Sequence, residues 1–194
     1  MKLLAGLAFA LQVALPQAPQ LSAEDLHRQA LARYRNGDAA GAVHQLEECV
    51  RNEPRYAEAW NDLGVILRKQ GDLPRAIESF EKAAAARPSY ATALYNLGLA
   101  YEANHEPGPA TARLRQALAL MPGMAQGHAV LGRLLLKQER PREAAAELRR
   151  ALELDRSLPG ARLLLGTALR EYGLITEASR EFSSPRARTS RQIS

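Results

Sequence analysis

Residues 57–90 read AEAWNDLGVILRKQGDLPRAIESFEKAAAARPSY, and the same 34-residue pattern recurs before and after them without an insertion. The period is clearest at small residues, where steps of 34 join Ala30, Gly64, Gly98, Gly132 and Gly166. Three more registers keep this phase: Ala42, Ala76, Ala110, Ala144 and Ala178; Cys49, Ala83, Ala117 and Ala151; Leu46, Phe80, Leu114, Leu148 and Phe182. A fixed period of about 20 to 50 residues indicates a solenoid of stacked repeats.

Each copy of the period is predicted to form two helices joined by a turn. Apolar side chains recur three and four residues apart in 59–67 and again in 76–84, which is the spacing of one helix face. Gly71 and Asp72 between the two runs form a turn signal, with Asp72 as the N-cap of the second helix. Pro88 cannot continue that helix and ends it. Because one hairpin cannot bury both of its faces, neighbouring copies must stack on it.

Small residues at the eighth and twentieth places, a large apolar residue at the fourth place and a proline near the end resemble a tetratricopeptide repeat. In residues 57–90 the pattern is Trp60, Leu63, Gly64, Leu67, Ala76, Phe80, Ala83 and Pro88. In the next copy it is Leu94, Leu97, Gly98, Tyr101, Ala110, Leu114, Ala117 and Pro122. The resemblance spans residues 23–184 and implies an all-α, right-handed superhelical solenoid of five helix-turn-helix hairpins.

The period also divides the chain into segments. Four full copies are expected, which we number one to four, followed by a shortened copy five and a basic tail with no apolar period. The predicted segments are 1–18 (signal peptide), 19–22 (linker), 23–56, 57–90, 91–124 and 125–158 (copies one to four), 159–184 (copy five) and 185–194 (tail).

The leader has the composition of a signal peptide. Lys2 is its one charge and precedes the apolar run 3–15, which is shorter than the roughly 20 residues of a spanning helix and fits a signal-peptide core. We therefore expect an exported protein, periplasmic or secreted, with no stable membrane span after processing. An uncleaved anchor and a buried helix that caps the array are the alternatives.

Two copies depart from the pattern in ways that carry expectations. The turn of copy three, residues 105–109, reads His-Glu-Pro-Gly-Pro, and its two prolines should stiffen the turn and delay the second helix. No further helix is expected after copy five, so Ile175, Ala178 and Phe182 should be exposed. This end could serve self-association, which makes a self-assembling structural element one alternative function. A shortened fragment of a longer array is the other.

No constellation in the sequence indicates catalysis, a metal or a cofactor. The histidines His27, His44, His105 and His128 lie in different copies without ligand spacing. The lone Cys49 occupies a small-residue register and is expected to be a small buried side chain. The net charge of +5 includes leader and tail residues, so the repeats are nearly balanced and carry no electrostatic footprint for nucleic acid. We predict a non-enzymatic protein.

The resemblance implies that the first helix of each copy lines a concave groove in which protein partners dock. The candidate partner-binding residues are Asn61, Asp62, Val65, Arg68, Lys69, Tyr95, Asn96, Leu99, Val130, Arg133, Lys137, Leu163, Leu164 and Arg170. Their apolar members form a strip, and their arginines and lysines flank it. A peptide or helix with apolar anchors and acidic flanks would complement this groove. Alternatively, the strip is covered by the curvature of the array or by a second copy.

Two groove chemistries of the family do not fit these residues. The clamp that holds a C-terminal carboxylate needs cations in the copies on either side of Asn96, and the matching places hold Asn61, Val65, Gln126 and Val130. The ladder that binds extended peptide backbones needs asparagine at the sixth place of successive copies, and only Asn96 supplies it. The partner must therefore be recognised in another way.

Overall fold

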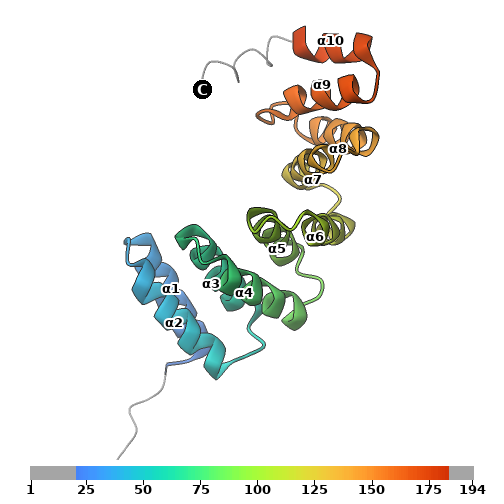
Figure 1. The fold of residues 1–194 in the computed structure, drawn as a ribbon. Coiled ribbons are helices and arrows are strands. Elements are labelled where there is room, and N and C mark those ends of the chain that lie inside the picture. The colour runs from blue at the N-terminus through green and yellow to red at the C-terminus, as the bar shows by residue number, and fades with distance from the viewer. Residues whose placement is uncertain (1–20, 184–194) are drawn as a thin grey trace, which may run out of the picture.

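In the computed structural model, the described residues 21–183 form ten α-helices and no strand (Figure 1). The helices are α1 (Ala23–Arg35), α2 (Ala39–Asn52), α3 (Ala57–Gln70), α4 (Leu73–Ala86), α5 (Ala91–Ala103), α6 (Pro107–Leu120), α7 (Ala125–Lys137), α8 (Pro141–Leu154), α9 (Ala161–Glu171) and α10 (Ile175–Ser183). The predicted all-α solenoid is thereby confirmed. The predicted leader, 1–18, and the basic tail, 185–194, lie outside the described residues.

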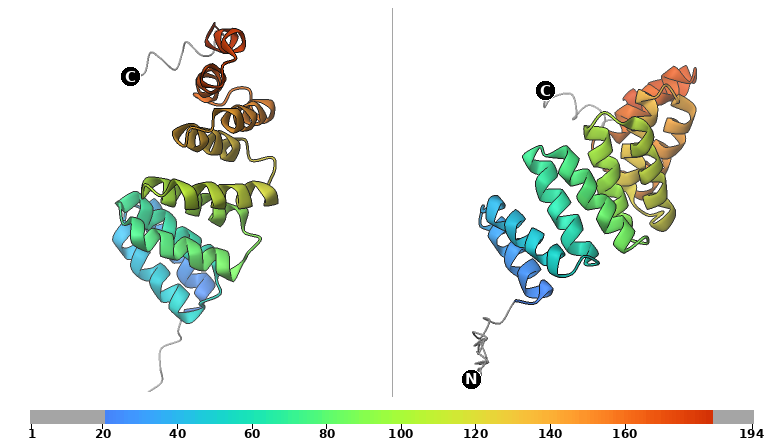
Figure 2. Two further views of the ribbon diagram at one scale, coloured as in Figure 1. Left: turned by 45° about the vertical axis from the view of Figure 1, so that its right-hand side comes forward. Right: turned by 60° about the horizontal axis from the view of Figure 1, so that its bottom comes forward.

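The helices stack as successive pairs along a curved array, with α1 and α10 at opposite ends (Figures 1 and 2). Each helix packs mainly against its neighbours in the chain, so the core runs along the array. The first helices also touch one another, α3 with α5 and α7 with α9, whereas the second helices do not pack together to that degree. The first helices therefore lie on the inner side of the curve. We call the side formed by α1, α3, α5, α7 and α9 the concave face and the side formed by the second helices the convex face.

One contact recurs inside the hairpins of copies two to five. The large side chain at the twenty-fourth place of the copy lies over the small residue at the eighth place, as Leu114 lies over Gly98. A Cβ atom on Gly98 would be 2.8 Å from Leu114 Cγ and 3.2 Å from the Ala110 carbonyl oxygen. Both distances are shorter than ordinary van der Waals contact, so the two helices could not stay this close with a larger residue there. Phe80 covers Gly64 in the same way.

The turn within each hairpin repeats a left-handed residue at its fifteenth place. Its φ angle is +87° at Gly37, +86° at Gly71 and +93° at Gly173, but the same place is His105 in copy three (+60°) and Glu139 in copy four (+57°). Left-handed backbone suits glycine because a Cβ atom crowds the following carbonyl. Copies three and four therefore have the common turn with a less suitable residue in it.

The expected delay of the second helix in copy three was wrong. Helix α6 begins at Pro107, the same seventeenth place at which α4 begins with Leu73. The backbone nitrogens in the first turn of a helix have no acceptor within that helix, so Pro107 and Pro109 remove no helical hydrogen bond.

The expected exposed face at the C-terminal end also needs correction. Ala178 is only 2% exposed, and Phe182 is half-buried because its ring lies over Gly166. Of the three residues expected to be exposed, only Ile175 is, with 58% of its surface accessible. Thr111 of α6 accepts a hydrogen bond from Gln138 of the next copy. The equivalent residue of α10 is Ser179, which is exposed. Copy five therefore closes its own hairpin and ends in a more polar outer surface than predicted.

The glycine contact predicts the effect of a single methyl group. Gly98→Ala should lower the free energy of unfolding by about 1 to 3 kcal/mol, because Leu114 or the backbone must shift to admit it. Gly108→Ala is the matched control, since a Cβ atom there meets nothing within 4 Å. Urea denaturation of both variants checks this, and equal stabilities would contradict the close approach.

The turn geometry predicts that two substitutions stabilise the array. His105→Gly and Glu139→Gly should each raise the free energy of unfolding by about 0.5 to 1 kcal/mol, because relief of the left-handed strain exceeds the entropy cost of glycine. Gly71→Ala should have the opposite effect. Thermal melts followed by circular dichroism measure all three, and a lower melting temperature for both glycine variants would refute the assignment of strain.

Candidate functional site

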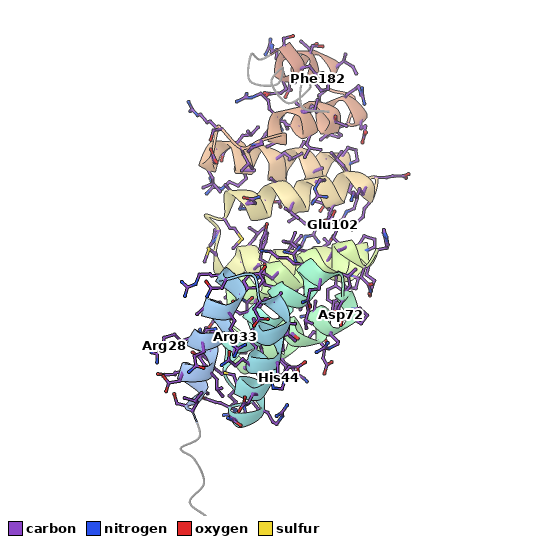
Figure 3. All side chains as sticks on the ribbon, turned by 90° about the vertical axis from the view of Figure 1, so that its left-hand side faces the viewer. Arg28, Arg33, His44, Asp72, Glu102 and Phe182 are labelled. Atoms are coloured by element: carbon purple, nitrogen blue, oxygen red, sulfur yellow. The ribbon has the colours of Figure 1, made fainter. Side chains whose placement is uncertain are left out.

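The sequence-predicted groove residues lie on α3, α5, α7 and α9, which are first helices of the array. They do not form the single strip of apolar side chains and free cations that the sequence suggested. The structure sorts them into a polar chain, a neutralised cluster, a half-buried arginine beside Tyr95, a partly covered apolar set and two further cations. Glu102 lies near the middle of the array (Figure 3).

The polar chain crosses three first helices. His27 Nε2 of α1 lies 2.8 Å from Asp62 Oδ2 of α3, and it carries the proton because a carboxylate can only accept. Asn61 Nδ2 donates to the other oxygen of Asp62 (3.2 Å), and Asn96 Nδ2 of α5 donates to Asn61 Oδ1 (2.9 Å). Asn61 is only 5% exposed, so it holds its neighbours in position and offers little surface. The sequence placed these residues on one face but did not show that they bond to one another.

The neutralised cluster is centred on Glu102 of α5. Arg133 of α7 donates two hydrogen bonds to its carboxylate, at 2.6 and 2.9 Å, and Lys137 donates a third at 2.9 Å. The Glu102 side chain is only 12% exposed. Two of the cations assigned to an acidic partner are therefore already paired, and they join copy three to copy four.

The half-buried arginine is Arg68 of α3. Its Nε atom is buried and bonds to no described residue, and no ion pair among residues 21–183 includes it. Arg68 acts electrostatically on the neighbouring half-buried Tyr95. Burial raises the pKa of the Tyr95 phenol, and the positive charges of Arg68 and Arg133 oppose that rise. Arg68 and Tyr95 therefore present a positive charge and a neutral hydroxyl donor side by side.

The apolar members of the predicted site are largely used in packing. Val65 packs against the N-terminal part of the core, and Leu99 and Leu164 pack against the C-terminal part. Val130 is only 9% exposed, and Leu163 is half-buried. The array's own packing thus covers much of the predicted strip and leaves only edges of these side chains for a partner.

The two remaining cations lie at the rim of the concave face. Lys69 Nζ lies 5.3 Å from the centre of the Tyr34 ring, a distance at which a cation is attracted to the ring. Arg170 is exposed in the last turn of α9. Neither is held as closely as Arg133, so both can contribute to long-range attraction.

No group of three His, Cys, Asp or Glu side chains within residues 21–183 could hold a metal ion. Cys49 is fully buried and its thiol lies 3.1 Å from the Ala23 carbonyl oxygen. Burial raises the pKa of this thiol to about 11, so it stays protonated and unreactive near neutral pH. Cys49 is the small buried side chain that its register predicted.

Among the described helices, none is both long and apolar enough to cross a membrane.

The family comparison agrees with this geometry. The tetratricopeptide repeat family matches residues 27–91, 67–125 and 129–182, and the chain belongs to that family. No curated protein matches it.

Several solved structures share the fold. A crystal structure of MamA is 24% identical, covers 84% of this chain and 94% of its own, and superposes with a TM-score of 0.77. MamA from Desulfovibrio magneticus RS-1 is 22% identical, with 91% and 99% covered and a TM-score of 0.78. YrrB, described as a tetratricopeptide repeat protein with an unusual peptide-binding site, is 27% identical, with 71% of each chain covered and a TM-score of 0.67. These likenesses agree with the all-α solenoid.

The Glu102 cluster predicts measurable coupling between copies three and four. In a double-mutant cycle of Glu102→Gln and Arg133→Gln, the coupling free energy should be about 1 to 2 kcal/mol, because the pair is bidentate and Glu102 is largely buried. The exposed Arg149 and Glu177 pair of α8 and α10 is the control, with an expected coupling below about 0.5 kcal/mol. Urea denaturation gives both values, and equal coupling in the two cycles would contradict the central role of Glu102.

Proposed function

We propose that this chain is a non-enzymatic adaptor that binds a peptide or helical segment of a protein partner on its concave face. Its family consists generally of interaction modules without catalytic activity. YrrB, which has the same fold, is described as having a peptide-binding site. The observation that carries the proposal is Arg68 of the concave face, whose buried Nε atom has no hydrogen-bond partner and which forms no ion pair within residues 21–183.

Arg68 selects the chemistry of the partner. A buried donor such as the Arg68 Nε–H is costly without an acceptor, and a carboxylate that reaches it forms a strong charge-assisted hydrogen bond. Arg133 and Lys137 offer less to a partner because Glu102 already neutralises them. An aspartate or glutamate of the partner therefore docks at Arg68, with the Tyr95 hydroxyl as a second donor.

The surroundings of Arg68 suit an extended or helical segment. The hydrogen bonds that link His27, Asp62, Asn61 and Asn96 hold these four side chains in position before a partner binds. This lowers the entropy cost of ordering the site. Val65 and Leu99 lie at the ninth place of their helices and supply partly exposed apolar surface. The bound segment would place its acidic residue at Arg68 and apolar residues toward these two side chains.

We also propose that the adaptor acts outside the cytoplasm, in the periplasm or secreted space. The support is the sequence of the leader, with Lys2 followed by the apolar run 3–15.

Binding after loss of the Arg68 charge tests the proposed function. Peptides selected from a random displayed library on the wild-type chain should be acidic, and Arg68→Gln should weaken them about 10- to 100-fold, the value of a hydrogen bond to a charged group. Isothermal titration calorimetry measures the change.

Arg142→Gln is the matched control, because Arg142 is an exposed arginine on α8, a helix of the convex face. It should leave the affinity unchanged. If Arg142→Gln weakens the selected peptides and Arg68→Gln does not, the concave face is not the binding site.

A further inference from the structure

We call the space between two successive second helices on the convex face a groove, and equivalent places of the repeat form it at each junction. The side chain at the fourth place of the first helix lines this groove where copies one and two and copies two and three meet. These fourth-place residues are Trp60 in the groove between copies one and two, Leu94 in the next, then His128 and Arg162. Comparison of the grooves shows which side chains of this protein occupy them.

In three grooves the fourth-place residue is large and carries N–H donors. Trp60 Nε1 donates to the carbonyl oxygen of Pro54 (2.9 Å), and Lys82 Nζ lies 4.5 Å from the centre of a Trp60 ring. His128 Nε2 donates to the carbonyl oxygen of Pro122 (3.0 Å). Pro122 occupies the same place in copy three as Pro54 in copy one. Trp60 and His128 thus satisfy the carbonyl group at the edge of their grooves.

Two of these occupants also pair with a carboxylate from the second helix of their own copy. His128 Nδ1 lies 2.7 Å from Glu147 Oε2, and Arg162 lies 3.2 Å from Glu181 Oε2. Glu147 and Glu181 occupy the same place in copies four and five. Each of these two grooves therefore places a carboxylate beside the nitrogen atoms of its occupant.

The groove between copies two and three lacks such an occupant. Leu94 and Leu97 form its floor, and one hollow of about 570 Å³ lies above them. In the preceding groove the Trp60 side chain instead lines two separate hollows of about 340 and 590 Å³. Its walls come from α4 and α6 and are mostly small or apolar: Ala84, Ala85, Pro88, Ala119 and Leu120, with Glu81, Arg113 and Gln116 at the polar edge. Within the described chain the Pro88 carbonyl oxygen accepts no hydrogen bond, although Pro88 occupies the place of Pro54 and Pro122.

The same groove holds the carboxylate of Glu81, which accepts a hydrogen bond from the Tyr101 hydroxyl (2.6 Å), and the guanidinium of Arg113, with which Glu81 forms no ion pair. Arg113 stands at the place that holds Glu147 and Glu181 in the later copies. Its one hydrogen bond to a described side chain goes to the neutral Gln116 (3.1 Å), and no carboxylate of residues 21–183 forms an ion pair with it. A groove with an apolar floor, a free carbonyl acceptor and a free cation calls for an apolar N–H donor next to a negative charge.

We propose that this groove binds the tryptophan side chain of a partner polypeptide, with an acidic residue next to that tryptophan. The indole fills the space that Trp60 fills in the preceding groove and donates its N–H to the Pro88 carbonyl oxygen. The acidic residue pairs with Arg113, which supplies the charge complementarity. This convex site is separate from the concave face, so the adaptor can hold two segments at once.

Titration of short peptides against the whole chain tests the site. Acetyl-Gly-Trp-Glu-Gly-amide should bind, and replacement of tryptophan by leucine should remove most of the binding. Methylation of the indole nitrogen should weaken it about 3- to 10-fold, the value of one neutral hydrogen bond. Isothermal titration calorimetry or chemical-shift perturbation provides the affinities. Equal binding of the tryptophan and leucine peptides would overturn the proposal.

Two substitutions that introduce residues of the neighbouring groove should fill the hollow, and we call them the plug variants. Leu94→Trp introduces the residue of copy two, and Ala85→Arg introduces Arg51 of the preceding groove at an exposed position. Both should lose peptide binding at least about 10-fold while the melting temperature stays equal or rises, since a filled hollow buries more apolar surface. Arg113→Gln should weaken the glutamate peptide but not its glutamine analogue, and Arg68→Gln should affect neither.

Retained binding in both plug variants would overturn the site. A wild-type chain that self-associates in sedimentation equilibrium and becomes monomeric with Ala85→Arg would show that a second copy occupies the groove, which also contradicts a partner tryptophan.

Discussion

The array depends on the contact between the eighth and twenty-fourth places of each copy. A large side chain such as Leu114 or Phe80 fits over a glycine on the facing helix, and this contact sets the distance between the two helices of a hairpin. Every hairpin then presents the same two faces to its neighbours, so the copies stack without a central core. The fold therefore tolerates wide variation at exposed places as long as this pair is kept.

That tolerance explains why the surface differs so much between copies. The fourth place is Trp60, Leu94, His128 or Arg162, because it lies in a groove between copies where the shape of the hairpin does not restrict it. The concave places vary in the same way, with Arg68 without an ion pair among residues 21–183 in one copy and Arg133 neutralised in another. The repeat pattern maintains the fold of such an array. Functional residues are therefore expected where a copy departs from that pattern.

The sequence predicted the fold well because the period is a local signal that all copies share. It predicted the electrostatics of the concave face poorly. Glu102 and Arg133 are 31 residues apart and meet only through the stacking of copies three and four, a distance that spacing within one helix does not give. The left-handed backbone of the turn could have been predicted from the sequence, because Gly37, Gly71 and Gly173 occupy the same place of the repeat as His105 and Glu139. The delay expected of α6 was wrong because two prolines in a first helical turn break no bond.

The most direct test of the central contact is a double-mutant cycle between Gly132 and Leu148 of copy four. A Cβ atom on Gly132 would lie 2.6 Å from Leu148 Cγ. Leu148→Ala should therefore remove most of the cost of Gly132→Ala, with a coupling free energy of about 1 kcal/mol or more in urea denaturation. The pair Gly132→Ala and Leu114→Ala, from different copies, should be additive. Additive effects for Gly132 and Leu148 as well would show that the glycine serves some purpose other than this contact.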